Sequence, residues 1–95
     1  MQVAIFYSQL KLEVADYSRW AEAMIERVQA QPGFIRAHSF RNESGFGVTL
    51  SYWETESDLK VWGRDETHQK AMAFGRDQAY SSYRLEIAEI QSVME

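Results

Sequence analysis

The stretch QVAIFYSQL, residues 2–10, is apolar on both of its alternating faces. So many β-branched and aromatic residues in a short run are typical of a β-strand. Successive side chains of a strand point to opposite sides, so both sides of this strand need an apolar cover. The chain has only 95 residues, and a domain of this size buries only about 60 to 65% of the surface that its unfolded chain exposes. The sequence therefore carries more apolar surface than one protomer readily hides.

An amphipathic helix is predicted between residues 17 and 28, where apolar side chains recur every three or four positions and charged ones take the other side. Asp16 is its expected N-cap. Pro32 and Gly33 then mark a turn.

Two more helices are predicted in the second half of the chain. Thr55 followed three residues later by Asp58 is typical of a capping box, and Gly63 is expected to end this short helix. Asp65 is expected to cap a longer helix. At about 100° per residue, its inner side carries His68, Ala71, Met72, Gly75 and Ala79.

A β-hairpin is predicted around the turn NESG, residues 42–45. Its first strand, FIRAHSFR, is expected to place Phe34, Arg36, His38 and Phe40 on one face. His38 is interpreted as a structural, buried histidine.

A last strand alternates through Tyr83, Leu85 and Ile87. Its apolar phase then moves to Ala88 and Ile90, which predicts a bulge or a change of packing surface. We expect the strand to leave its own sheet there and to meet a partner subunit.

The predicted order is strand, helix, strand, strand, two helices, strand. This is the split βαβ pattern of a ferredoxin-like α+β domain with an antiparallel sheet, formed by residues 1–95 as a single domain. Helices cover one face of the sheet. The other apolar face needs a second sheet, which a homodimer that closes into an α+β barrel would supply.

Composition excludes several classes. The net charge is −4 and the ten basic residues are dispersed, so no basic stripe is available for nucleic acid. Charged residues interrupt the first apolar stretch, so neither a signal peptide nor a membrane span is expected. Cysteine is absent, which favours the cytoplasm. The two histidines form no recognised metal-site spacing, so no metal is expected.

A candidate site comes from Asp58 and Trp62, which share a helix face, and from His68, which follows six residues after Trp62 beyond a glycine. These three side chains are the candidate catalytic residues if they converge on a cleft between the helices and the sheet. In the structural alternative, Trp62 anchors the core, Asp58 favours the helix start through the macrodipole, and His68 is a partly buried structural histidine.

The small residues Ala71 and Gly75 leave space beside His68 that something else must fill. The filler is either a large aromatic side chain of the core or a flat bound ligand, since dense aromatics with a few polar groups describe many ligand sites. The candidate substrate-binding residues are Tyr7, Trp53, Met72, Tyr80 and Tyr83.

Four pieces of the sequence together resemble the antibiotic biosynthesis monooxygenase superfamily, and within it a branch of small, mostly uncharacterised bacterial proteins. They are QPGFI at 31–35, VTLSYWETESDLKVW at 48–62, His68, and FGRDQAYSSYRLEIAEI at 74–90. The resemblance implies a ferredoxin-like protomer and a dimeric α+β barrel. Members of this superfamily include cofactor-independent oxygenases that turn phenolic anthrones into quinones, and enzymes that bind and degrade haem.

The site positions match these two chemistries unequally. In the quinone-forming enzymes an asparagine, a tryptophan and a tyrosine line the cleft where this chain has Asp58, Trp62 and His68, so only the tryptophan agrees. Haem degradation requires a first-strand asparagine and a histidine ten residues after the tryptophan, and here that last position is Met72. The fit to haem degradation is poor, although one histidine suffices to ligate haem iron.

The resemblance therefore implies a cofactor-independent monooxygenase that acts on a small aromatic or polyphenolic compound with O2. His68 would be the base, Trp62 would stack on the substrate and steady an oxyanion, and Asp58 would orient His68 or act as base. Tyr80 or Tyr83 would donate a further hydrogen bond. The alternatives are a non-catalytic dimer that binds a hydrophobic small molecule and a haem-binding protein with His68 as axial ligand.

Overall fold

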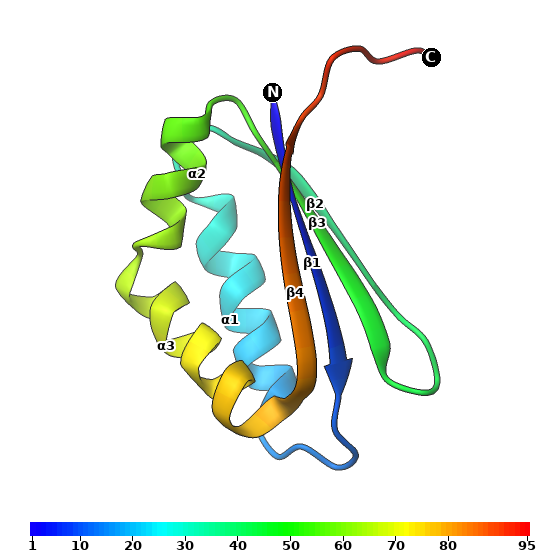
Figure 1. Cartoon of the computed structure of the whole chain (residues 1–95). Coiled ribbons are helices and arrows are strands. Elements are labelled where there is room, and N and C mark those ends of the chain that lie inside the picture. The colour runs from blue at the N-terminus through cyan, green and yellow to red at the C-terminus, as the bar shows by residue number, and fades with distance from the viewer.

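The computed structural model describes residues 1–95 and has the α+β, ferredoxin-like element order expected from the sequence (Figure 1). In chain order the elements are β1 (Gln2–Leu10), α1 (Tyr17–Gln29), β2 (Phe34–Arg41), β3 (Phe46–Trp53), α2 (Glu56–Gly63), α3 (Glu66–Phe74), the π-helical turn η1 (Gly75–Ala79) and β4 (Tyr80–Glu89). None of the helices combines the length and the apolar character that a membrane crossing requires.

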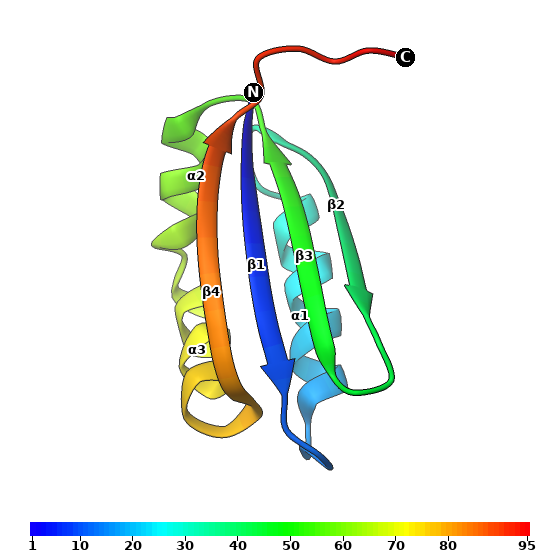
Figure 2. The same cartoon turned by 45° about the vertical axis from the view of Figure 1, so that its right-hand side comes forward.

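The four strands form one antiparallel sheet in the order β2-β3-β1-β4. All helices lie against one face of this sheet, and the other face carries no helix (Figures 1 and 2). The molecule is therefore a two-layer structure with one bare sheet face, which is the face that the sequence predicts to meet a partner.

The core lies between the layers, around the fully buried Trp53 at the end of β3. Trp62 of α2 lies roughly parallel to Trp53, with ring centroids 6.3 Å apart. The other members of the buried cluster are Ala4, Val28 and Leu59. Large aromatic side chains bury much apolar area each, so this cluster joins the sheet to both α1 and α2.

A register shift in β2 changes one predicted face. Phe34 pairs opposite Trp53 and the next pair is Arg36 with Tyr52, so Ile35 is an extra residue. The Phe34 ring packs edge-on against Trp53 in the core, whereas Arg36 lies over Tyr52 on the bare face. Placing Phe34 on the same face as Arg36 was therefore wrong, because a bulge reverses the alternation.

The helix caps differ in how well the sequence predicted them. The Thr55 side chain accepts the backbone N–H of Asp58, and Asp65 caps α3 in the same way, so both predicted caps are confirmed. Asp16 stands at the N-cap of α1 but makes no side-chain capping bond. Its backbone is left-handed, with φ 64°, and its carboxylate instead accepts a hydrogen bond from Arg19.

The last helix and strand also depart from the prediction. α3 ends at Phe74 and continues as the π-helical turn η1, and Met72 is 44% exposed rather than on the buried side. β4 pairs with β1 in unbroken register from Ser82 to Glu89, so the bulge predicted near Ala88 was wrong; the register shift of this pair lies at the other end, between Gln9 and Leu10. The change of apolar phase marks the end of the strand, after which the chain leaves the sheet (Figure 1).

Gly33 offers a direct test of this packing. It has φ +77°, and a Cβ added there would overlap the Asp58 side chain. We expect Gly33→Ala to lower the free energy of unfolding by about 1 to 2 kcal/mol from backbone strain alone, with the clash adding to this. Gly63→Ala is the matched control, since nothing lies within 4 Å of its Cβ position, and it should raise stability by up to about 1 kcal/mol. Urea denaturation measures both, and an equally stable Gly33→Ala variant would contradict this packing.

Candidate functional site

His68 lies in the first turn of α3 and its imidazole stacks on the Trp62 indole. The ring centroids are 4.2 Å apart and the planes differ by 9°. The His68 Nδ1 atom lies 2.9 Å from the Trp62 carbonyl oxygen. A carbonyl oxygen can only accept a hydrogen bond, so the proton of the neutral imidazole is on Nδ1 and the lone pair is on Nε2.

The Nε2 atom of His68 has no hydrogen-bond partner within the protein, and it is not sealed from solvent. Burial lowers the pKa of His68 from its ordinary value, against weaker opposing effects of the Trp62 carbonyl and of Asp65. The imidazole is therefore neutral at pH 7 and presents a free lone pair, which are the two properties that a general base needs.

Trp62 is buried, and the nearly parallel His68 ring covers one face of its indole. Its indole N–H donates no hydrogen bond, whereas the N–H of Trp53 donates to the Ser51 hydroxyl at 3.1 Å. Little of the Trp62 ring surface is left for stacking on a ligand. The unpartnered N–H remains available as a donor.

Asp58 and His68 are not joined by a hydrogen bond. The Asp58 carboxylate accepts from the Thr55 hydroxyl at 2.8 Å, and the side chain packs against Gly33. The group that holds the His68 ring nitrogen is a backbone carbonyl of α2, not a carboxylate.

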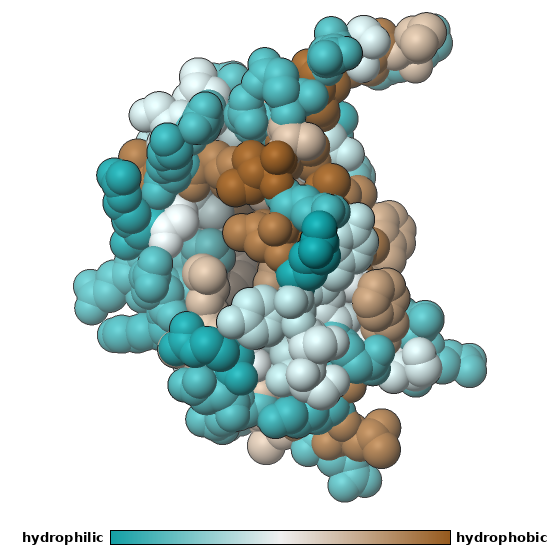
Figure 3. All heavy atoms as spheres, in the orientation of Figure 1, coloured by the Kyte–Doolittle hydropathy of each residue, from teal (hydrophilic) through white to brown (hydrophobic).

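A groove runs between α3 and β4. Tyr83, Leu85 and Ile87 pair opposite the helix-facing residues of β1, so they too point to the helix side. They are nevertheless 53 to 55% exposed, because the helices do not cover this edge of the sheet. Figure 3 shows a hollow between the helices and β4, with apolar side chains along its upper rim and hydrophilic ones on other sides. Met72, one turn after His68 on α3, is exposed on the same helix.

Tyr80 belongs to a separate polar cluster beside the π-helical turn. Its hydroxyl lies 3.4 Å from that of Tyr17, and Arg41 donates to the Tyr17 hydroxyl at 2.9 Å. Burial raises the pKa of Tyr80. A Cβ at Gly75 would lie 2.6 Å from the Tyr80 ring, so glycine lets this ring pack against the turn.

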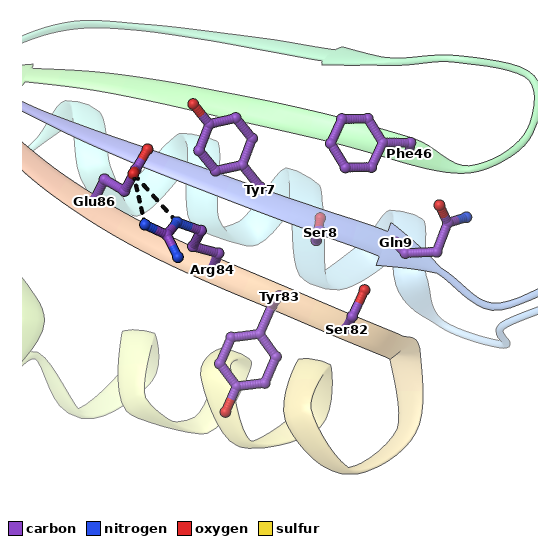
Figure 4. A pocket seen from close by; sticks show the side chains of 8 residues that line it. All are labelled: Tyr7, Ser8, Gln9, Phe46, Ser82, Tyr83, Arg84 and Glu86. Atoms are coloured by element: carbon purple, nitrogen blue, oxygen red, sulfur yellow. Dashed lines mark hydrogen bonds and ion pairs between the residues drawn. The ribbon is translucent and has the colours of Figure 1, made fainter.

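Tyr7 lies on the bare face of the sheet and stacks on Phe46 at 6.4 Å. Both border a hollow of about 500 Å³. In Figure 4 the Arg84–Glu86 pair lies beside Tyr7, while Tyr83 points toward the helices. The sheet therefore separates Tyr7 from His68, and the predicted ligand-contacting residues do not line one cavity.

Sequence reasoning missed two groups of residues. Asp65 was recognised as a cap, but its partner Arg27 is 38 positions away and gave no local signal. Leu85 and Ile87 were recognised as one strand face, yet their exposure depends on where the helices lie.

His38 was interpreted as buried and is exposed on the bare face, stacked on Phe40. No group of three or more potential metal-ligating side chains lies together.

The comparisons with known proteins agree with this architecture. The family model described as "Antibiotic biosynthesis monooxygenase" matches residues 2–73. The uncharacterized protein YqjZ of Bacillus subtilis (strain 168) is 34% identical over 88 residues, which cover 92% of this chain and 77% of YqjZ.

Two solved structures share the fold at low identity. SnoaB from Streptomyces nogalater, a cofactor-independent oxygenase, superposes with a TM-score of 0.82 at 10% identity, over 98% of this chain and 95% of its own. A protein from Deinococcus radiodurans assigned to the antibiotic biosynthesis monooxygenases reaches a TM-score of 0.88 at 8% identity, over 100% and 97%. With the family match across most of its length, the chain belongs to the antibiotic biosynthesis monooxygenase family.

Proposed function

We propose that this protein is a cofactor-independent monooxygenase that oxidises a small aromatic or polyphenolic compound with O2. The observation that carries the proposal is the neutral His68 imidazole, whose unpartnered Nε2 is on the helix that borders the groove along β4. Family membership supports the reaction class, and the fold is shared with a cofactor-independent oxygenase.

The substrate itself supplies the electrons in such a reaction. His68 Nε2 removes a proton from an acidic CH2 group of an anthrone-like phenol, and the resulting carbanion reduces O2 and forms a C–O bond. The peroxide takes that proton. Loss of the second C–H proton then breaks the O–O bond, so one oxygen atom stays as a carbonyl group and the other leaves as water.

In this proposal two hydrogen-bond donors assist the reaction. The Trp62 indole N–H is unpartnered and would stabilise the negative oxygen of the substrate or of the peroxide. The Tyr83 hydroxyl points to the helix side and would donate from β4. Tyr80 is engaged with Tyr17, so we assign it no role in the reaction. Leu85 and Ile87 give the groove an apolar side, and a substrate packed against it would be shielded from water on that side.

Replacing the base tests the proposal. We expect His68→Gln to lower kcat/KM by about 100- to 10,000-fold because general-base catalysis is lost, while circular dichroism shows the fold intact. Oxygen uptake with a panel of anthrones is the measurement. His38→Gln is the matched control, since the chain has two histidines and His38 lies on the bare face.

Equal rates in His68→Gln and wild-type protein would rule out His68 as the base. If no compound is consumed but Trp fluorescence reports saturable binding, the protein is a binding module. A haemin titration covers the other alternative: a saturable visible band that His68→Ala abolishes would make it a haem protein and overturn the cofactor-free mechanism.

The pH dependence follows from the lowered pKa of His68. The reactive form is the neutral imidazole, whose fraction increases as the pH rises through that pKa. We expect log kcat/KM to rise with pH, with a midpoint below 6.5, the ordinary histidine value, and to be level above it. A steady-state profile measures this, and a midpoint above 6.5 would contradict the assignment.

We also propose that the bare sheet face joins two copies into a homodimer. This face carries apolar side chains from β2, β3 and β1, and Phe40 and Phe46 on it are 62% and 48% exposed. Exposed apolar patches of this kind are typical of interaction surfaces. A second copy would cover them and also the hollow beside Tyr7.

A charge placed on this face should separate the copies. We expect Leu50→Glu, in the central strand β3, to convert a dimer into a monomer because a buried unpaired charge is costly. Ile25→Glu is the control, since Ile25 is 55% exposed but lies on α1 in the helix layer. Light scattering after size exclusion gives the mass, and a wild-type monomer would refute the dimer.

A further inference from the structure

An ion pair between two helices holds the first turn of α3. Arg27, near the end of α1, donates from Nε to Oδ2 and from Nη2 to Oδ1 of Asp65, each at 2.8 Å. Two parallel hydrogen bonds fix orientation as well as distance. Asp65 is only 11% exposed, so the pair is better shielded from water than the other ion pairs of the chain.

The same carboxylate is also hydrogen-bonded to the backbone of the candidate base. Oδ2 of Asp65 also accepts the backbone N–H of His68 at 3.0 Å. The His68 ring in turn bonds to the Trp62 carbonyl and stacks on the Trp62 indole. A continuous path of hydrogen bonds therefore runs from Arg27 of α1 through Asp65 to His68 and α2.

We propose that Arg27 and Asp65 are positioning residues for His68. Together they hold the His68 ring against Trp62, with Nε2 directed away from the protein's own hydrogen-bonding groups. The proposal deepens the proposed function and rests on it in so far as His68 is the base. Arg27 bonds to Asp65, and Asp65 bonds to the backbone of His68, so neither is assigned a part in the reaction itself.

The charges around His68 give this arrangement a second signature. Asp65 is the charged group whose electrostatic attraction acts directly on the His68 imidazole. Arg27 of α1 is paired with Asp65, and the charge of Glu66 acts on Arg27. The aromatic side chains next in the stack, Trp62 of α2 and Trp53 of β3, are uncharged. The Arg27 guanidinium holds the pKa of Asp65 at about 2, so the carboxylate is charged wherever His68 titrates. Arg27 thereby offsets the attraction of Asp65 for a proton on His68.

The test is a titration by NMR of protein with isotope-labelled histidine, since the chain has only two histidines and His38→Gln assigns them. Two quantities are read for His68: the titration midpoint, and the upfield ring-current shift that the stack on Trp62 produces. His38 serves as an internal reference that no variant should move.

We expect opposite effects from the two members of the pair. Arg27→Met leaves the Asp65 charge uncompensated, so the midpoint of His68 should rise by about half a pH unit and the ring-current shift should diminish. Asp65→Asn keeps an oxygen for the His68 N–H but removes the charge, so the midpoint should fall by a similar amount. Glu66→Gln is the control, since it removes the charge of the residue next to Asp65, from a side chain that is 85% exposed. It should change neither the midpoint nor the ring-current shift of His68.

A folded Arg27→Met protein with wild-type midpoint and ring-current shift would overturn the proposal, even if its Tm were lower, because the pair would then be merely structural. If Arg27→Met does not fold, Arg27→Lys replaces it, because lysine keeps the charge without the paired hydrogen bonds. Arg27→Lys should reduce the ring-current shift of His68 without raising its titration midpoint. Wild-type values of both quantities in Arg27→Lys and in Asp65→Asn would also overturn the proposal. Oxygen uptake plays no part in this measurement. Failure of the oxygenase function and failure of the positioning role are therefore seen separately.

Discussion

The packing of the Trp53 side chain joins the sheet to the helix layer of this protein. It stands at the end of β3, is completely buried, and contacts the edge of Phe34 and the parallel ring of Trp62. His68 then stacks on Trp62. One series of aromatic rings thus extends from the sheet through α2 to the first turn of α3, and the candidate base takes its place from the packing of the core.

This packing also explains why a groove exists. Because the aromatic core holds the helices over β1 and β3, the edge strand β4 is left uncovered, and its helix-facing residues Leu85 and Ile87 remain half-exposed. A groove with an apolar side suits an uncharged, flat molecule, and a neutral imidazole beside it is suited to removing a proton from such a molecule. The Nε2 atom of His68 carries the lone pair because the Nδ1 proton is donated to a backbone carbonyl. Site and core are thus parts of one arrangement.

The sequence was informative wherever short-range rules decide. The boundaries of β2, the N-caps Thr55 and Asp65, and the end of α2 at Gly63 all follow from residues a few positions apart. Short-range reasoning failed where one extra residue changes a register, as at Ile35, and where a left-handed residue replaces a cap, as at Asp16. In the site it grouped Trp62 with His68 correctly in space. It also grouped Asp58 and Tyr7 with them, although the Asp58 carboxylate is bonded to the Thr55 hydroxyl and Tyr7 lies across the sheet.

By itself the sequence determined the order of elements, the α+β class and a first strand that needs apolar cover on both sides, because alternation and capping are local properties of the chain. Only the tertiary structure decided which nitrogen of His68 is free, that Arg27 reaches Asp65, and which strand the helices leave open. These depend on contacts between residues tens of positions apart. Such contacts arise from how the aromatic core packs, and no local pattern encodes that packing.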